Sequence, residues 1–162
     1  MDRSHPDVIV VGAGISGITA ARKLQSYGHV VTVIEKGRGV GGRMATRRFA
    51  GATFDHGAQF FTSRGSDFEK LIEAASQQGA VKKWTDGFSE SPDGYPRWCG
   101  SSGMTSLVKW MVAEANITVH TATTVNDLRD MPANAYILTA PVPQSLAILS
   151  FSQMLPNPET HI

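Results

Sequence analysis

Three features that define large classes of proteins are scarce in this sequence. Cys99 is the only cysteine among 162 residues, which excludes an intramolecular disulfide framework and a C-x-x-C metal or redox motif. The net charge is only +1, so no general electrostatic attraction to nucleic acid or to an anionic membrane is expected. No apolar run approaches the length of a membrane span. These absences favour a soluble globular protein without a nucleic-acid or membrane partner.

The lone cysteine and the N-terminal residues also bear on the cellular compartment. A reducing environment is the simplest inference from a single thiol, and nothing beside Cys99 in the sequence marks it as reactive. We therefore expect a buried, inert thiol. The apolar run that follows residues 1–7 is too short for the core of a signal peptide. We expect a cytoplasmic protein.

The chain is organised around its opening stretch, residues 7–43. Residues 8–11 (VIVV) are apolar and β-branched, the pattern of a strand buried on both faces of a parallel sheet. Gly12, Gly14 and Gly17 follow with the spacing G-x-G-x-x-G. The first glycine allows a tight turn, the second lets the backbone approach a pyrophosphate, and the third lets a helix pack closely on the strand.

A helix is predicted to follow this turn. Apolar residues recur at near-helical spacing from Ile15 to residue 24, and Gly28 is placed to stop the helix. The first N–H groups of such a helix, at Ile15 and Ser16, have no partner within the helix and point toward the turn. Together with the positive end of the helix dipole they form an anion site without any charged side chain.

A second β-rich run, residues 30–34, ends in Glu35, which follows Gly12 by 23 positions (35 minus 12). At that place a carboxylate accepts hydrogen bonds from the ribose of an adenosine. The alternative is an ordinary βαβ unit with a glycine-rich turn and a solvated Glu35. Strand, turn, helix, strand and acid all appear in order, and this order favours a site for a nucleotide diphosphate.

The segment after Glu35 is rich in glycine and positive charge. Five basic residues and no acid occupy residues 36–48, namely Lys36, Arg38, Arg43, Arg47 and Arg48. A solvated basic face is one interpretation. With a pyrophosphate predicted nearby, we expect Arg43 to contact phosphate, because a guanidinium matches phosphate geometry. The glycines of this segment suit a second close approach of backbone to a ligand.

At this point the sequence resembles the flavin-containing amine oxidase superfamily and, within it, the renalase-like proteins. The resemblance rests on the opening βαβ unit, the Glu35-Lys36 pair, the Gly41-Gly42-Arg43 triplet and residues 54–61 (FDHGAQFF). Proteins of this kind bind FAD. The resemblance therefore implies FAD as the cofactor of this chain.

The resemblance also implies which residues hold the cofactor. Glu35 would hold the adenosine ribose, residues 41–43 would lie along the pyrophosphate and flavin, and residues 57–59 would sit near the isoalloxazine. Val125 would lie beside the adenine through backbone groups. The implied cofactor-binding residues are Gly12, Gly14, Ile15, Ser16, Gly17, Glu35, Lys36, Gly41, Gly42, Arg43, Gly57, Ala58, Gln59, Val125, Thr139 and Ala140.

The implied reaction is oxidation of a C–H bond beside nitrogen, in an amine or a dihydronicotinamide nucleotide. Electrons would pass through the flavin to oxygen and give hydrogen peroxide. No catalytic residue is identified, and no metal ligands are expected. Asp55 and His56 are a tempting acid–base pair, but neighbours on a strand face opposite sides, so a structural role or a hydrogen bond at the cofactor edge is favoured for His56.

The rest of the sequence predicts helices, strands and loops that support the site. Residues 44–61 suggest short strands or extended loops, and residues 80–100 suggest strands and turns. The aromatic side chains of residues 80–100 could line a pocket over a flat ring, but core packing is favoured. A capping box at residues 66–69 predicts a helix that ends at Gly79, and residues 101–103 offer caps for a helix over 104–115. Strands are expected over 117–121 and 135–140, and a loop over 155–162.

The expected fold class is α/β. A Rossmann-like FAD-binding domain with a mainly parallel sheet is predicted from residues 1–62 and 100–141. A partial, β-rich substrate-side region is predicted from residues 63–99 and 142–162. Proteins of the resembled family are about twice as long, so this chain corresponds to their N-terminal half.

Two alternatives stay open at this point. A nicotinamide-dependent dehydrogenase would share the opening βαβ unit but leaves residues 41–43 unexplained. A non-catalytic dinucleotide-binding fragment would bind adenine nucleotide without turnover. Such a fragment is also expected to expose an apolar face where further strands belong, and either to self-associate through its incomplete sheet or to take up a second chain.

Overall fold

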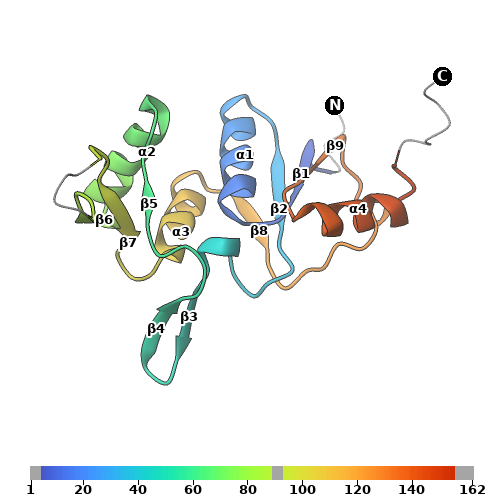
Figure 1. Cartoon of the computed structure of the whole chain (residues 1–162). Coiled ribbons are helices and arrows are strands. Elements are labelled where there is room, and N and C mark those ends of the chain that lie inside the picture. Colours follow the sequence, from blue (N-terminus) through green and yellow to red (C-terminus); the bar gives the residue numbers. More distant parts are fainter. Residues whose placement is uncertain (1–4, 89–92, 156–162) are drawn as a thin grey trace. The chain divides into compact units, whose positions relative to one another are not determined.

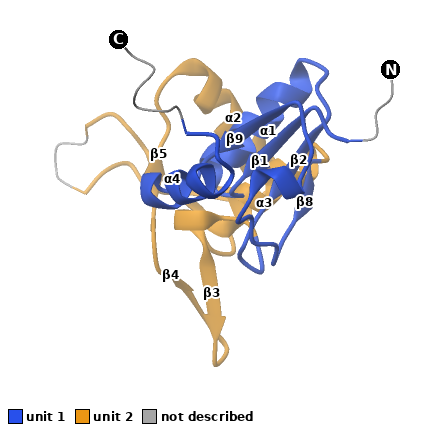
Figure 2. Cartoon of the chain, turned by 90° about the vertical axis from the view of Figure 1, so that its right-hand side faces the viewer, with its two compact units in different colours: residues 1–39, 117–162 blue, residues 40–116 orange. Residues whose placement is uncertain are grey.

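The structure is a computed structural model that describes residues 5–88 and 93–155. It divides into two compact units (Figure 2), residues 1–39 with 117–162 (unit 1) and residues 40–116 (unit 2). The units divide after residues 39 and 116, whereas the predicted domain boundaries follow residues 62, 99 and 141. The functional division of the chain stays a prediction, and the predicted C-terminal loop lies outside the described residues from residue 156 onward.

Unit 1 is built on a four-stranded parallel sheet in the order β8-β2-β1-β9 (Figure 1). All four residues of β1 are buried, as expected for a strand at the centre of a parallel sheet. The α/β class predicted from the sequence is confirmed. The strands are β1 (Val8–Val11), β2 (Val31–Ile34), β8 (Thr118–His120) and β9 (Ala135–Leu138).

Helix α1 (Ile15–Ser26) packs on β1 and β2. Ile18 and Ala21, one turn apart, are fully buried. The helix ends where predicted, since Gly28 adopts a φ of +86° and donates its N–H to the Gln25 carbonyl at 2.9 Å. Glycine suits this left-handed conformation because it has no Cβ to clash with the backbone.

A second layer covers the core cluster of Ile9, Val11, Ile34, Val125 and Leu128. It consists of the loop around the 3-10 turn η2 (Leu128–Asp130) and helix α4 (Val142–Phe151), whose Ile148 and Leu149 pack on the cluster. Helix α4 was not predicted, and the prediction of a β-rich region over these residues is wrong. The prolines at 141 and 143 suggested only the end of a strand. A proline in the first helical turn is tolerated because its missing N–H would have no helical acceptor.

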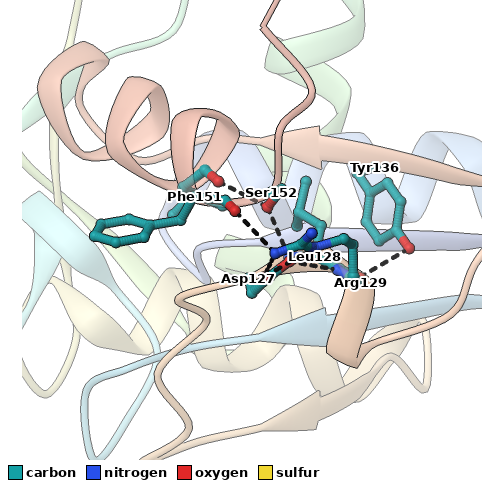
Figure 3. Close-up of polar contacts among 7 residues, drawn as sticks. Asp127, Leu128, Arg129, Tyr136, Phe151 and Ser152 are labelled. Carbon is teal, nitrogen blue, oxygen red and sulfur yellow. Dashed lines mark hydrogen bonds and ion pairs between the residues drawn. The ribbon is translucent and has the colours of Figure 1, made fainter.

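Polar contacts fasten the end of α4 to η2 (Figure 3). The buried Ser152 hydroxyl accepts a hydrogen bond from the Leu128 N–H at 2.8 Å. Arg129 bonds the Asp127 carboxylate through Nε at 3.0 Å and donates to the Phe151 carbonyl at 3.2 Å. These bonds join a turn and a helix end that lie more than twenty residues apart in the sequence.

Unit 2 contains a hairpin, a small antiparallel sheet and two helices. The sheet has the order β5-β7-β6, and the predicted strands within 44–61 and 80–100 are confirmed. Its elements are the 3-10 turn η1 (Gly42–Met44), β3 (Thr46–Phe49), β4 (Ala52–Asp55), β5 (Phe61–Thr62), α2 (Ser66–Gln77), β6 (Val81–Thr85), β7 (Arg97–Gly100) and α3 (Thr105–Glu114).

The side chains of this small sheet are less buried than predicted. Phe60, Trp84 and Phe88 contact one another with ring centroids 5.1 to 5.9 Å apart, yet each is exposed. The prediction that the aromatic residues of 80–100 pack in a core is therefore wrong for Trp84 and Phe88. Cys99 in β7 is a free thiol and is half-buried, whereas a buried thiol was expected.

Both predicted N-terminal caps in unit 2 are wrong. The N-cap of α2 is Gly65, so Ser66 already lies in the helix and no side chain caps it. Met104 is the N-cap of α3 in place of residues 101–103, and its N–H donates to the Asp55 carboxylate at 2.9 Å. The predicted end of α2 is confirmed, with Gly79 at a φ of +71°. Among the described residues, no helix has the length and apolar character needed to cross a membrane.

The Asp127–Arg129 pair makes the stability of unit 1 depend on pH. Hydrogen bonds from the side chain and backbone of Arg129 lower the pKa of Asp127 from its ordinary 3.8 to about 2. A lowered pKa in the folded state means that the ionised pair stabilises the fold above about pH 4. This contribution is lost as the pH falls through about 2.

We therefore expect Asp127→Asn to lower the urea midpoint of unfolding at pH 7. The difference in midpoint between this variant and the parent chain should narrow as the pH falls from 4 to 2. Urea unfolding across this pH range measures the effect. Arg129→Gln and the double variant complete a cycle that separates the pair from the single side chains. A gap that widens toward low pH would contradict this account.

Candidate nucleotide-binding site

The glycine turn between β1 and α1 is packed too tightly for side chains at two positions. A Cβ on Gly12, which has a φ of +110°, would lie 2.6 Å from the Thr139 hydroxyl oxygen. A Cβ on Gly17 would lie 1.9 Å from the Gly12 carbonyl oxygen. The structure thus gives Gly17 the close helix–strand contact predicted for the third glycine. Gly14 has a φ of −72°, which any residue can adopt.

The N-terminus of α1 begins at this turn. Gly14 is its N-cap, no side chain caps the helix and its first turn holds no acidic residue. The first helical bond runs from the Ile18 N–H to the Gly14 carbonyl at 3.0 Å. The N–H groups of Ile15, Ser16 and Gly17 therefore have no acceptor within the helix, because helix geometry supplies none. This arrangement suits an anionic group.

Glu35 at the end of β2 is held beside the turn. One carboxylate oxygen accepts the Ala13 N–H at 2.8 Å and the other accepts the Gly37 N–H at 2.7 Å. Glu35 is therefore fixed and half-buried, which argues against the solvated acid of the alternative interpretation. Each oxygen keeps a lone pair for a further donor such as a ribose hydroxyl. The hydrogen bond from the Ala13 N–H was not predicted. Ala13 occupies a variable position of the glycine motif and donates through its backbone, so its side chain does not indicate the bond.

Thr139 lies directly after β9 and its side chain reaches the same turn. Its hydroxyl oxygen is 3.0 Å from the Val11 carbonyl oxygen and 3.2 Å from the Gly12 carbonyl oxygen, so it donates to one or shares its proton. The structure thus brings Thr139 to the predicted site. Its hydroxyl holds the turn in place and is not left free for a ligand.

Unit 1 contains three further residues that were predicted to bind the cofactor, Lys36, Val125 and Ala140. Val125 buries its side chain in the core cluster, which leaves only its backbone for a ligand. Lys36 is exposed. The Ala140 carbonyl accepts a hydrogen bond from the Ser145 hydroxyl at 3.0 Å, which links the end of β9 to the first turn of α4.

The predicted cofactor segments of unit 2 contact each other. A Cβ on Gly57 would lie 2.0 Å from the Arg43 carbonyl oxygen, and the Ala58 N–H donates to that oxygen at 2.9 Å. Gly41 and Gly42 have φ of +129° and +54°, so the sharp turn before η1 uses their conformational freedom. The side chains of Arg43 and Gln59 are exposed.

A polar network holds η1 against the hairpin and α3. The buried Thr105 hydroxyl accepts the Thr46 N–H at 2.6 Å and donates to the Met44 carbonyl at 3.1 Å. The Asp55 carboxylate accepts from the Thr46 hydroxyl at 2.5 Å and from the Met104 N–H. Asp55 is thus a structural acceptor, which supports the prediction that it forms no dyad with His56.

The face of the β3–β4 hairpin opposite Thr46 and Asp55 contains none of the predicted cofactor-binding residues. Arg47, Phe49, Phe54 and His56 line a shallow open depression there. Among residues 5–88 and 93–155, no group of three His, Cys, Asp or Glu side chains is arranged to hold a metal ion.

The close contact at Gly17 generates a stability prediction. Gly17→Ala should lower the free energy of unfolding by about 1–3 kcal/mol, because a methyl group there overlaps a backbone carbonyl that cannot rotate away. Urea unfolding measures the change. Gly39→Ala is the matched control, since nothing lies within 4 Å of a Cβ at that position. Equal losses in both variants would show that the contact is not as tight as described.

The network around η1 generates a second prediction. Thr105→Val keeps the shape of the side chain but leaves the Thr46 N–H and the Met44 carbonyl without their partner, at a cost of about 1–3 kcal/mol. Thr53→Val, at an exposed position of β4, should change stability little. Thermal unfolding of both variants and of the parent chain measures the difference. A Thr105→Val protein that is as stable as the parent chain would argue against the network.

Comparison with known proteins agrees with this geometry. Residues 10–75 match the family of NAD(P)-binding Rossmann-like domains. A 4,4'-diapophytoene desaturase (4,4'-diaponeurosporene-forming) of Staphylococcus aureus strain Newman is 40% identical over 76 residues, which cover 41% of this chain and 15% of the desaturase. This chain therefore corresponds to a small part of that relative.

Solved structures support the fold alone. A fatty acid isomerase from P. acnes that produces CLA aligns with a TM-score of 0.67 at 11% identity, over 91% of this chain and 62% of the isomerase. The PF1083 protein from Pyrococcus furiosus aligns with a TM-score of 0.55 at 14% identity, over 93% of this chain and 65% of that protein. The parallel sheet, the glycine turn and the sequence match together show that residues 10–75 carry a Rossmann-like dinucleotide-binding motif.

Proposed function

We propose that this chain is the dinucleotide-binding part of an FAD-dependent oxidoreductase of the amine-oxidase-like, renalase-like kind. The observation that carries the proposal is the junction of three groups of unit 1. The uncapped N-terminus of α1, the close-packed Gly12 and Gly17, and the Glu35 carboxylate all meet at the end of β1. An adenosine diphosphate group needs these partners, namely N–H donors for the phosphates and an acceptor for the ribose.

The residues present fit the adenosine diphosphate portion of FAD. The N–H groups at Ile15 and Ser16 would face the pyrophosphate, and Gly14 would let the backbone approach it. Glu35 would accept from the ribose hydroxyls, already oriented by the Ala13 and Gly37 N–H groups. No rearrangement of these groups is needed, so little of the binding free energy is spent on ordering them.

Residues of unit 2 support FAD over a plain nicotinamide nucleotide. The glycine-rich turn at 41–42 and the exposed Arg43 side chain have the chemical character of a second phosphate-binding segment. The loop at Gly57 and Ala58 is fastened to the Arg43 backbone, so the two segments implied to contact the flavin are coupled. The resemblance of residues 36–43 and 54–61 to flavin-dependent oxidases adds to this support.

The proposed reaction is the oxidation of a C–H bond beside nitrogen, in an amine or a dihydronicotinamide nucleotide, with oxygen reduced to hydrogen peroxide. When bound, FAD supplies the two-electron acceptor chemistry that protein side chains lack. The contribution of this chain is to bind and orient the cofactor. We assign no acid or base, because Asp55 is engaged in the structural network around η1.

Two other functions have specific support. The matched family is described as NAD(P)-binding, which favours a nicotinamide-dependent dehydrogenase. A non-catalytic dinucleotide-binding protein is the other alternative, because the residues described here bind and orient a nucleotide but include no assigned acid or base. The three functions differ in the ligand retained and in turnover, and one set of measurements separates them.

The purified chain, reconstituted with FAD and desalted, should show a flavin absorption spectrum at close to one flavin per chain. Identification of the released cofactor by mass, followed by peroxide assays with amines and dihydronicotinamides, tests the reaction. A colourless protein that binds NAD would favour the dehydrogenase. Binding of ADP without flavin retention or turnover would favour the fragment, and either result would overturn the proposal.

A single substitution tests the placement of the site. Gly14→Val should abolish FAD retention while leaving the free energy of unfolding within about 1 kcal/mol of the parent chain, since Gly14 has no positive φ and its side chain would face the ligand. Ala113→Val, at an exposed position of α3 that is not among the implied cofactor-binding residues, is the control and should retain FAD. Retention by Gly14→Val at the parent level would move the pyrophosphate away from this turn.

A further inference from the structure

One peptide group of the glycine turn is held at both of its ends. Gly12 and Ala13 share this peptide, whose carbonyl belongs to Gly12 and whose N–H belongs to Ala13. The carbonyl oxygen lies 3.2 Å from the Thr139 hydroxyl oxygen, and the N–H donates to the Glu35 carboxylate at 2.8 Å. A trans peptide is planar, so its carbonyl and its N–H point in opposite directions and turn together. The peptide therefore links Thr139 to Glu35.

The Thr139 hydroxyl matters most to the Gly12 carbonyl. Its other neighbour, the Val11 carbonyl oxygen, lies 3.0 Å away and also accepts the Thr139 N–H at 2.9 Å. The Val11 carbonyl therefore keeps a backbone donor when the hydroxyl is removed. The Gly12 carbonyl depends more strongly on the side chain, because a carbonyl that loses its donor inside a packed turn is costly to leave in place.

Glycine makes this restraint necessary. Gly12 has a φ of +110°, which glycine adopts freely, and no Cβ limits the rotation of the peptide that follows it. Two glycines also leave the room that the hydroxyl occupies. A Cβ on Gly12 would lie 2.6 Å from the Thr139 hydroxyl oxygen, and a Cβ on Gly17 would lie 2.9 Å from it. The two glycines and Thr139 thus form one packed unit.

We propose that Thr139 is a positioning residue for the ribose of the bound nucleotide and acts on Glu35 through the Gly12–Ala13 peptide. Its hydroxyl sets the direction of the Ala13 N–H, and that N–H orients one of the two Glu35 carboxylate oxygens. Without the hydroxyl the peptide is free to turn, and the carboxylate loses part of the fixed orientation that favours ribose hydroxyls. The inference rests on the proposed nucleotide site and does not depend on the proposed oxidation.

Calorimetric titration of the whole chain with ADP and with 2',3'-dideoxy-ADP tests this role, since only ADP carries the ribose hydroxyls. Thr139→Val should raise the dissociation constant for ADP at least about tenfold, and that for dideoxy-ADP less than about threefold. The phosphate site should change little, because the Ile18 N–H holds the start of α1 through the Gly14 carbonyl at 3.0 Å. Equal losses for the two nucleotides would overturn the inference.

Three further variants separate the hydroxyl from the shape of the side chain. Thr139→Ser keeps the hydroxyl and should bind ADP within about threefold of the parent chain. Thr139→Ala removes the hydroxyl without placing a methyl group beside the two carbonyls, and should lose ADP affinity as Thr139→Val does. Thr53→Val, at an exposed position of β4, is the matched control and should bind ADP as the parent chain does. A loss in Thr139→Val alone would indicate crowding and would overturn the inference.

Amide hydrogen exchange tests the link without a nucleotide. The Ala13 N–H should exchange at least about tenfold faster in Thr139→Val, because its hydrogen bond to Glu35 opens more often. The Gly12 N–H, which donates to the Ile34 carbonyl at 2.8 Å, is the internal control and should change less. Unchanged exchange at Ala13 would overturn the inference.

The titrations also distinguish this inference from the proposed function. A parent chain that binds ADP, with a Thr139→Val variant that binds it equally well, would overturn the role of Thr139 and leave the nucleotide site in place. A parent chain that binds neither ADP nor dideoxy-ADP would overturn the proposed function and, with it, the role of Thr139.

Discussion

The close contact between α1 and β1 is the constraint on which the rest of unit 1 depends. Because Gly17 has no side chain, the start of α1 lies against the Gly12 carbonyl. This close contact places the N-terminus of α1 at the carboxyl end of the sheet, where Glu35 and Thr139 also lie. Parallel strands direct their ends to one edge, so this contact turns three distant parts of the sequence into one anion-facing site.

Much of this site could be predicted because its signals are local. The buried strand, the glycine spacing and the acid at the end of the next strand all lie within residues 8–35. Glu35 lies beside the turn through its bond to the Ala13 N–H, which was not predicted, and its role toward a ribose stays a prediction. Thr139 was assigned to the site by resemblance alone, and its contact with the Val11 carbonyl spans 128 positions of sequence, which no periodicity or spacing can encode.

The errors have a common physical origin. The sequence analysis assigned local caps to α2 and α3, whereas α3 takes its partner from Asp55, 49 positions away. It missed α4 because two prolines looked like breaks, yet in a first turn they cost no helical hydrogen bond. It placed the unit 2 aromatics in a core, although Trp84 and Phe88 are exposed. In each case the outcome depends on where a residue lies in the folded chain, which the local sequence does not state.

Glu35 shows how folding prepares the site for one kind of ligand. Both carboxylate oxygens are oriented by backbone N–H groups, so the charge is fixed in place whether or not a nucleotide is bound. A fixed carboxylate accepts hydrogen bonds from ribose hydroxyls and repels a phosphate at the 2' position. For the proposed site this favours FAD or NAD over NADP. The basic residues that follow Glu35 do not remove this bias in the described structure, because Lys36 is exposed and the carboxylate is bonded only by uncharged groups.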